Sequence, residues 1–156
     1  MMKVLIGFAS LTSNTEDIMM ILKNKLEALN CEVAVEDLDL IPLQKLSQYD
    51  LVFFGSYTWG DGDLPYELED MYEELDEVDL TGMSFGVFGS GDRFYPAFCQ
   101  AVDLLADKVK ERGADVFSSL LKIEFSPDSE EEVQECEQFA VGAYEWAKEK
   151  DTSHAR

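Results

Sequence analysis

The sequence of 156 residues has few of the residue types that build disulfides or metal sites. It has three cysteines, Cys31, Cys99 and Cys136, with no C-x-x-C pair, and one histidine, His154, in the polar tail 151–156. This pattern argues against a disulfide framework and against a zinc site, and it favours a reduced, cytoplasmic protein. We therefore expect no bound metal, and we expect His154 to be unstructured.

Basic residues are also scarce. Twelve Lys and Arg stand against 33 Asp and Glu, which gives a formal net charge of −21. Such a protein would be repelled by nucleic acid and by anionic membranes, so we expect neither as a partner. Partners with basic patches would be attracted, although an excess of acid also serves solubility. The segment from Asp61 to Asp79 carries ten acids and no Lys or Arg.

Long apolar runs are missing as well. No stretch reaches the roughly 18 residues that indicate a membrane-spanning helix, and the apolar run at the N-terminus is too short for a signal peptide. A chain of this length with 46% apolar residues can build one domain with its own core. We expect that domain to occupy residues 1–150, with 151–156 as a tail.

Apolar strands and amphipathic helices alternate along the chain. Strands are predicted at 3–9, 31–38, 50–56, 83–90 and 115–125, and helices at 15–29, 66–75, 97–112 and after Pro127. The fifth strand has a bend near Ser118, and the last helix opens with Ser129 and Glu132 as a capping box. The alternation predicts a three-layer, doubly wound α/β fold around a five-stranded parallel sheet. Strand 31–38, the one with an alternating pattern, is expected at the sheet edge.

Ligands of such sheets bind outside the carboxyl ends of the strands, where the strand order reverses. The loops that follow the first, third and fourth strands should meet there. They are SLTSNTE (10–16), SYTWGDGD (56–63) and GSGDRFYPAFC (89–99). Each is rich in hydroxyls, glycine or aromatic residues, so we expect a binding site built from all three.

The first loop offers many hydrogen-bond donors and leads directly into a helix. Its hydroxyls and the backbone N–H groups of a helix N-terminus would form an anion site without any Lys or Arg. The loop lacks the pattern of a Walker A motif and the three glycines of a dinucleotide fingerprint. Taken alone, the stretch from Ser13 to Glu16 also fits an ordinary capping box.

The second and third loops each add an aromatic residue, Trp59 and Tyr95. The third loop opens with glycines but has Phe94 where a dinucleotide fingerprint needs its third glycine. Taken singly, Trp59 fits a partly buried surface residue, and Tyr95 fits a core residue in a glycine-rich connection. Together, an anion cradle and two aromatic side chains suit a flat, phosphorylated ring system on which aromatic faces stack. Flavin mononucleotide (FMN) fits that description best.

With these three loops the sequence resembles the flavodoxin family over nearly its whole length. SLTSNT is similar to the family's phosphate loop, Ser/Thr-x-Thr-Gly-x-Thr. SYTWGDGDLP and GSGDRFYPAFC resemble the loops whose aromatic residues cover the two flavin faces. The fifth strand has no long insertion near 118–120, as in the short-chain subgroup. The resemblance implies the flavodoxin-like strand order 2-1-3-4-5.

The resemblance also implies which residues bind FMN. The expected set is Ser10, Leu11, Thr12, Ser13, Asn14, Thr15, Ser56, Tyr57, Thr58, Trp59, Gly60, Asp61, Ser90, Gly91, Asp92, Tyr95, Phe98 and Cys99. In the first loop, Ser10, Thr12, Asn14, Thr15 and the backbone amides would hold the phosphate. Ser13 stands where the family has glycine, and a serine with positive φ there would cost about 1 kcal/mol.

By the same resemblance, the second and third loops would bind the flavin ring. By resemblance, Trp59 and Tyr95 would sandwich the isoalloxazine ring, and Asp92 and the Cys99 amide would meet its pyrimidine edge. Gly60 matches the residue whose carbonyl turns toward the central-ring nitrogen once that nitrogen is protonated. Such a peptide flip needs the conformational freedom of glycine.

The function implied is electron transfer and not an enzyme activity. The protein would be a low-potential one-electron carrier that binds FMN non-covalently and shuttles between the semiquinone and hydroquinone states. As a monomer it would meet basic-patched redox proteins through the acidic segment 61–79. The expected donor is a ferredoxin/flavodoxin-NADP reductase, and the expected acceptors are haem mono-oxygenases or other reductive enzymes.

Three other functions compete with this interpretation. A small FMN-dependent NAD(P)H:quinone reductase of the same fold needs a substrate pocket over the flavin, which Trp59 and Tyr95 would block. A signalling receiver domain needs an acidic pair after the first strand and an Asp after the third, and the sequence has neither. An acidic interaction module without a cofactor would be colourless.

Overall fold

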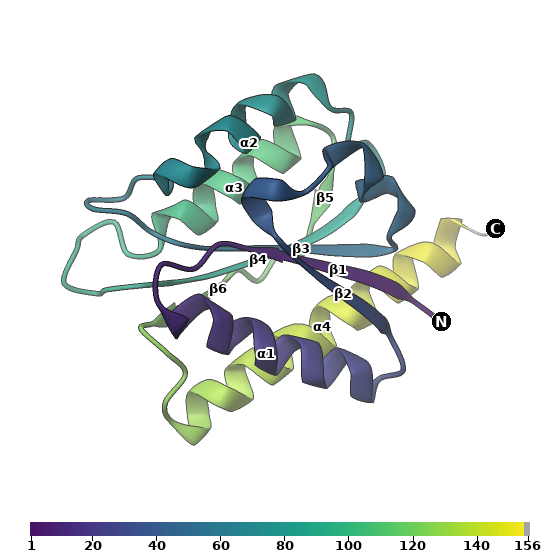
Figure 1. The fold of residues 1–156 in the computed structure, drawn as a ribbon. Helices are drawn as coiled ribbons and strands as arrows, with labels where there is room; N and C mark the ends of the chain where they lie inside the picture. Colours follow the sequence, from purple (N-terminus) through teal and green to yellow (C-terminus); the bar gives the residue numbers. More distant parts are fainter. Residues whose placement is uncertain (155–156) are drawn as a thin grey trace.

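The apolar strands form one parallel sheet at the centre of the molecule (Figure 1). The computed structural model describes residues 1–154, with strands β1 (Lys3–Phe8), β2 (Glu32–Asp37), β3 (Leu51–Tyr57), β4 (Ser84–Gly91), β5 (Asp115–Val116) and β6 (Leu121–Glu124). The order is β2-β1-β3-β4-β5, and β6 also pairs with β4. This confirms the predicted fold class and strand order, with the alternating segment β2 at the edge.

The predicted fifth strand, 115–125, is divided in two. β5 pairs with Ser84 and Phe85 at the start of β4, and β6 pairs with the end of β4 from Phe88 to Gly91. Between them the Phe117 ring turns onto α4, where its centroid lies 5.7 Å from that of Trp146. The expectation of one bent strand is therefore corrected to two short segments that share β4 as their neighbour. No long insertion separates them.

Helices cover both faces of the sheet (Figure 1). On one face lie α1 (Ser13–Ala28) and α4 (Glu130–His154), and on the other lie α2 (Glu69–Glu74) and α3 (Gln100–Glu111). The predicted helix 66–75 consists of α2 between two 3-10 turns, Tyr66–Leu68 and Leu75–Glu77. None of the helices in the described part of the chain is long and apolar enough to cross a membrane.

Neighbouring residues of each strand fill separate cores on the two faces. Phe53 and Phe88 belong to the core under α1 and α4, and Phe54 and Phe85 belong to the core under α2 and α3. All four rings are completely buried. Because both faces of β3 and β4 are covered, these strands have apolar residues on both faces, which is the reason that the sequence shows no alternation there.

Helix α4 begins with the predicted capping box. The Glu132 amide donates to Ser129 Oγ over 3.1 Å, and Ser129 Oγ lies 3.1 Å from Glu132 Oε1. The helix continues to His154 because no glycine or proline follows Gly142 to end it. The expectation that His154 is unstructured is therefore wrong. Residues 155 and 156 lie outside the described residues.

The buried thiol of Cys136 makes stability depend on alkaline pH. Burial, and then the carboxylates of Glu135, Glu132 and Glu137, raise its pKa from 9.0 to about 12. Between these values the unfolded chain binds fewer protons than the folded one, so the free energy of unfolding falls as pH rises. We expect Cys136→Ala to make this fall shallower, by at most about 1.4 kcal/mol per pH unit.

Urea unfolding of the wild type and the variant at about pH 8 and about pH 10.5 measures that slope. Val133→Ala serves as a control because it removes apolar volume from the same helix without removing a titrating group. Equal slopes for Cys136→Ala and the wild type would contradict the prediction.

Candidate functional site

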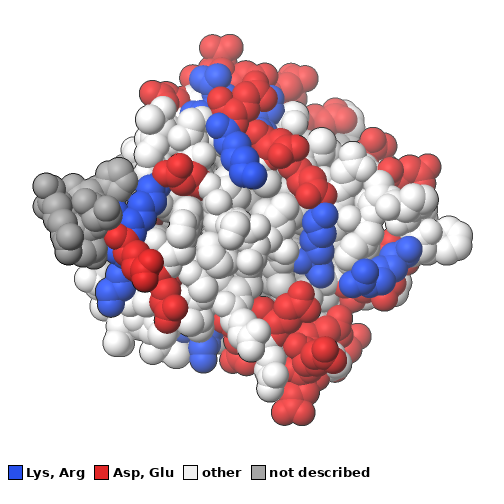
Figure 2. Space-filling view, turned by 180° about the vertical axis from the view of Figure 1, so that it is seen from behind, with Lys and Arg blue, Asp and Glu red and all other residues white. Residues whose placement is uncertain are grey.

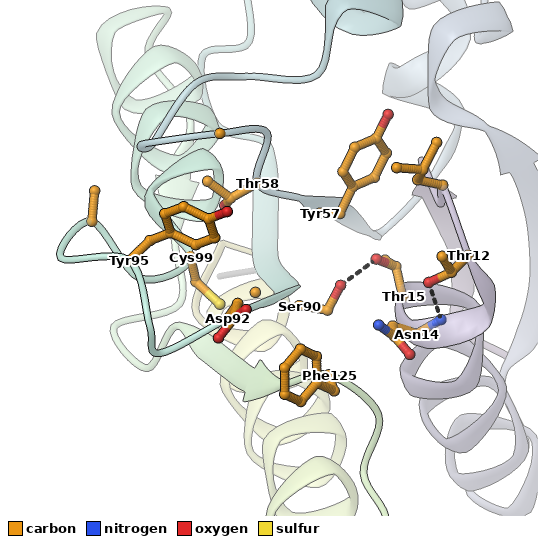
Figure 3. Close-up of a pocket in the computed structure, with 14 residues that line it drawn as sticks. Thr12, Asn14, Thr15, Tyr57, Thr58, Ser90, Asp92, Tyr95, Cys99 and Phe125 are labelled. Carbon is orange, nitrogen blue, oxygen red and sulfur yellow. Dashed lines mark hydrogen bonds between the residues drawn. The ribbon is translucent and has the colours of Figure 1, made fainter.

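A cavity of about 170 Å³ lies at the carboxyl ends of β1, β3 and β4 (Figure 3). It is lined by Leu11, Thr12, Asn14, Thr15, Tyr57, Thr58, Gly60, Ser90, Gly91, Asp92, Tyr95, Ala97, Cys99 and Phe125. All three predicted loops contribute to this lining. They meet because β1 lies between β2 and β3, which reverses the direction in which the sheet is built.

Most of the residues expected to bind FMN line this cavity, and the rest lie near it. The predicted residues outside the lining are Ser10, Ser13, Ser56, Trp59, Asp61 and Phe98. Ser56 is buried in β3, and its hydroxyl donates to the Tyr57 carbonyl over 2.7 Å. Phe98 packs against the core under α2 and α3. Trp59 is 54% exposed on the turn beside the cavity, so its ring is available to a ligand that extends out of it.

The first loop ends in a capped helix. Thr12 is the N-cap of α1, and its Oγ1 accepts a hydrogen bond from the backbone N–H of Asn14 over 3.4 Å. Ser10 Oγ donates to the Thr12 carbonyl, which closes the loop on itself. Ser13 is the first residue of the helix and is not among the described non-glycine residues with positive φ. Serine at this position therefore carries no left-handed strain.

A buried hydrogen bond ties the first loop to the third. Thr15 Oγ1 lies 2.7 Å from Ser90 Oγ, and both side chains are at most 2% exposed. The second loop is tied to α3, since the Ala101 amide donates to Thr58 Oγ1 over 3.1 Å. These bonds link segments that are far apart in sequence, so the loops hold a fixed arrangement around the cavity.

The second loop forms a tight turn. The amides of Gly62 and Asp63 both donate to the Trp59 carbonyl, over 3.3 and 2.8 Å, and the Trp59 amide donates back to the Asp63 carbonyl. Gly60 has φ +54 and Gly62 has φ +120, so both occupy conformations that side chains disfavour. A Cβ at Gly62 would lie 2.7 Å from that of Ala97, so glycine also lets the turn pack against the third loop.

The third loop is shaped by Asp92 and Cys99. The Phe94 amide donates to Asp92 Oδ1 over 2.9 Å, which leaves the other carboxylate oxygen for a ligand. Cys99 has φ 53 and precedes α3, so the predicted helix at 97–112 begins only at Gln100. Burial raises the pKa of the Cys99 thiol to about 12, against smaller opposing effects of Lys122 and Arg93. This thiol is unreactive at neutral pH.

Hydroxyls, amides and aromatic rings dominate the cavity, and no Lys or Arg appears in its lining. An anion at the first loop would therefore be held by neutral donors and by the N-terminus of α1. The Tyr57 hydroxyl donates to Glu67 over 2.7 Å, and burial followed by this bond raises its pKa to about 12. Among the described residues, no group of three or more His, Cys, Asp or Glu could hold a metal ion.

Two residues of the lining, Ala97 and Phe125, were not predicted from the sequence. Ala97 lies inside the third loop but has no polar group to attract notice. Phe125 follows β6 and is 50% exposed with φ 55. The available signal was the expected end of the fifth strand, which reaches the same edge of the sheet as the strands before it.

The fold and the cavity define a class of protein. It is the class of doubly wound α/β domains with a cavity lined by uncharged hydrogen-bond donors where the strand order reverses. Comparison with known families then places the chain within that class. The flavodoxin model matches residues 6–139, so the chain belongs to the flavodoxin family. This confirms the family inferred from the three loops.

Individual relatives agree with this assignment. The chain is 44% identical over 147 residues to probable flavodoxin 1 of Bacillus subtilis (strain 168), covering 94% of this chain and 93% of the relative. Oxidised flavodoxin 2 from Bacillus cereus superposes with a TM-score of 0.89 at 43% identity, over 92% and 98% of the two chains. A short-chain flavodoxin associated with a non-canonical PDU bacterial microcompartment superposes with a TM-score of 0.88 at 32% identity, over 94% and 99%.

FMN is the cofactor of this family and of this chain. The residues present fit it. The first loop supplies neutral donors at a helix N-terminus, as a phosphate requires, and Tyr95 provides an aromatic face. A Cβ at Gly91 would come within 2.9 Å of Cys99 Sγ, so glycine there allows the third loop to close on the start of α3.

The Thr15–Ser90 bond generates a test of how the loops are held together. We expect Thr15→Val to lower the free energy of unfolding by about 1–3 kcal/mol, because it leaves the buried Ser90 hydroxyl without its partner. The double variant Thr15→Val/Ser90→Ala should recover part of that loss, since both polar groups are then gone. Urea unfolding without FMN measures these differences. Strictly additive losses would show that the two hydroxyls do not interact.

Proposed function

We propose that this flavodoxin is a low-potential one-electron carrier that moves between the semiquinone and hydroquinone states of FMN. The observation that carries the proposal is the size of the cavity. Its volume of about 170 Å³ is smaller than the roughly 300–1,000 Å³ of sites that enclose a small molecule. A flavin would extend out of it to the protein surface, which suits transfer of electrons to another protein better than turnover of a second bound substrate.

The lining supports the same proposal. Cys99 is the one thiol in it and has a pKa near 12, and Asp92 is the one carboxylate and already accepts from the Phe94 amide. Neither is arranged as a nucleophile beside a base. FMN supplies the redox chemistry when it is bound, and the chain binds it and sets its electrostatic environment.

We assign the two ends of FMN to different loops. The phosphate lies at the first loop, where the amides at the start of α1 and the side chains of Thr12 and Asn14 donate to it. The ring lies between Trp59 and Tyr95, which come from the second and third loops. The cradle of neutral donors supports the first placement, and the exposure of both aromatic rings supports the second.

Gly60 would control the first electron. Its carbonyl would accept a hydrogen bond from the protonated central ring nitrogen after the peptide turns. A Cβ built on Gly60 would have Asp63 Oδ2, at 4.0 Å, as its nearest neighbour, so the surrounding space permits such a turn. The exposed acids Asp61 and Asp63 and the lining acid Asp92 would then disfavour the second electron, because it creates a negative charge beside them.

The first test is a visible spectrum of the purified protein during stepwise anaerobic reduction. We expect a yellow protein that turns blue, through a neutral radical, before it bleaches. Direct bleaching, together with turnover of a nicotinamide donor and a quinone, would instead show a quinone reductase. Protein that stays colourless after FMN is added would contradict both functions.

A substitution at Gly60 tests the peptide turn. Gly60→Val should narrow the gap between the two reduction potentials by roughly 20–60 mV, the equivalent of one hydrogen bond. Gly82→Val is a matched control, because Gly82 also has positive φ and open space around it but lies outside the cavity lining. A redox titration measures both gaps. An unchanged gap in Gly60→Val would exclude the peptide turn.

The acidic segment 61–79 would be the docking surface for basic redox partners. It begins at the turn beside the cavity, so a partner bound to it would lie close to the cofactor. Acids are not confined to this segment. Figure 2, which views the back of the molecule, shows them over the beginning of α4 and along the edge where α2 and α3 lie, with basic side chains between. Residues 123–147 also lack Lys and Arg, so segment 61–79 is distinguished by its position at the turn beside the cavity.

Salt should therefore slow electron transfer. We expect the rate of reduction by a ferredoxin/flavodoxin-NADP reductase to fall several-fold between about 0.05 and about 0.5 M salt. Asp61→Asn/Asp63→Asn should weaken that dependence. Glu145→Gln/Glu149→Gln, which removes the same charge near the far end of α4, should not. Stopped-flow kinetics provide the rates, and equal salt dependence in all three proteins would remove segment 61–79 as the docking surface.

A further inference from the structure

Phe125, in the segment 124–126 that follows β6, forms a fourth wall of the cavity beyond the three predicted loops. Figure 3 shows the Phe125 ring beside the cavity, near Ser90 and Asp92. The segment is bonded to the third loop, since the Phe125 amide donates to the Gly91 carbonyl over 2.9 Å. The Arg93 amide also donates to Glu124 Oε2, over 3.1 Å. The chain leaving β6 is therefore fixed in position against the site.

Phe125 has φ 55, a left-handed conformation that residues with a side chain rarely adopt. Such outliers persist where the surrounding structure enforces them, and they concentrate at functional sites. Here the next residue, Ser126, meets the start of α1. Its Oγ lies 2.7 Å from Asn14 Oδ1 and 2.9 Å from Asp17 Oδ2. Ser126 thus contacts the first loop although it is 112 residues away in sequence.

The number of hydrogens in this group limits what it can do. A serine hydroxyl has one hydrogen, so Ser126 donates either to Asn14 or to the carboxylate of Asp17. When it donates to Asn14 Oδ1, the NH₂ of the Asn14 amide is left to face the cavity. When it donates to Asp17, Asn14 has to turn its NH₂ toward Ser126 and its oxygen toward the cavity. A phosphate dianion has only acceptor oxygens, so it can form a hydrogen bond with Asn14 only in the first arrangement, in which the NH₂ group faces the cavity.

We propose that Ser126 is a positioning residue that orients the side-chain amide of Asn14 so that its NH₂ donates to the phosphate of FMN. Asp17 competes with Asn14 for the hydrogen of the Ser126 hydroxyl. This inference rests on the placement of the phosphate proposed above. It adds a residue that does not line the cavity itself and that acts through Asn14. Its consequence is specific, because only ligands that carry the phosphate gain from the orientation.

Riboflavin provides the matching ligand, since it has the same ring as FMN and no phosphate. We expect Ser126→Ala to weaken the binding of FMN about three- to tenfold and to leave the binding of riboflavin within about twofold. Ser126→Thr keeps the hydroxyl and should bind FMN like the wild type. Ser119→Ala, in the exposed connection between β5 and β6, is the control. Quenching of flavin fluorescence, with protein freed of its flavin, gives the dissociation constants.

Asp17→Asn tests the competition. It should tighten FMN binding, because the hydroxyl of Ser126 is then no longer drawn to a charged acceptor. Removing a negative charge near the phosphate would also tighten binding, so the comparison must be made in two backgrounds. If Asp17 acts through Ser126, the gain should be at least about twofold smaller in the Ser126→Ala background than in the wild type.

Each result decides one part of the inference. An equal loss for FMN and riboflavin in Ser126→Ala would mean that Ser126 has a merely structural role and would overturn the proposal. The same gain from Asp17→Asn in both backgrounds would overturn the competition. A wild type that prefers FMN, with a Ser126→Ala variant that keeps the full preference, would overturn this inference alone. A wild type without any preference would overturn the phosphate placement as well.

Discussion

The structure depends on the position of β1 between β2 and β3. β1 pairs in parallel with β2 on one side and with β3 on the other, so β2 is added at one edge of the sheet and the later strands are added at the opposite edge. The carboxyl ends of β1, β3 and β4 consequently open onto one edge, with Phe8 beside Gly55 and Tyr57 beside Ser90. The three predicted loops meet because of this register, since each of these strands delivers its loop to the same place.

Neutral groups hold the site together, and in the proposed placement of FMN they would also bind its phosphate. Thr15 bonds to Ser90, Thr58 bonds to the first turn of α3, and Ser126 reaches Asn14, all without a basic side chain. In a protein of net charge −21, a phosphate is repelled by distant carboxylates but attracted by nearby amides. Salt screens the distant charges and leaves short hydrogen bonds almost unaffected, so the local donors decide binding.

The acidic segment has its own attachment to the fold. Lys108 of α3 lies 2.6 Å from Asp76 and 4.4 Å from the centroid of the Tyr72 ring, and it is only 8% exposed. The hydrogen bond to Asp76 raises the pKa of Lys108, so the ammonium keeps its charge, and with it this ion pair, to higher pH than an ordinary lysine would. This lysine, together with the buried side chains of Leu68, Met71 and Leu75, attaches a segment that contains ten acids. Glu67 and Asp79 accept hydrogen bonds from Tyr57 and Thr81, and the other exposed carboxylates are left for solubility and docking.

The sequence by itself determined the elements, the fold class, the family and three of the four walls of the site. Those features follow from local periodicity, from the Ser129 capping box and from three ordered loops, which neighbouring residues specify. Only the tertiary structure decided that the fifth strand divides after Val116, that α3 begins after Cys99, that Phe125 lines the cavity, and that Ser126 contacts Asn14. Each of these depends on a contact between distant segments, such as Phe117 on α4 or Ser126 on Asn14. No local pattern encodes such a contact, because its partner is supplied only when the sheet brings the two segments together.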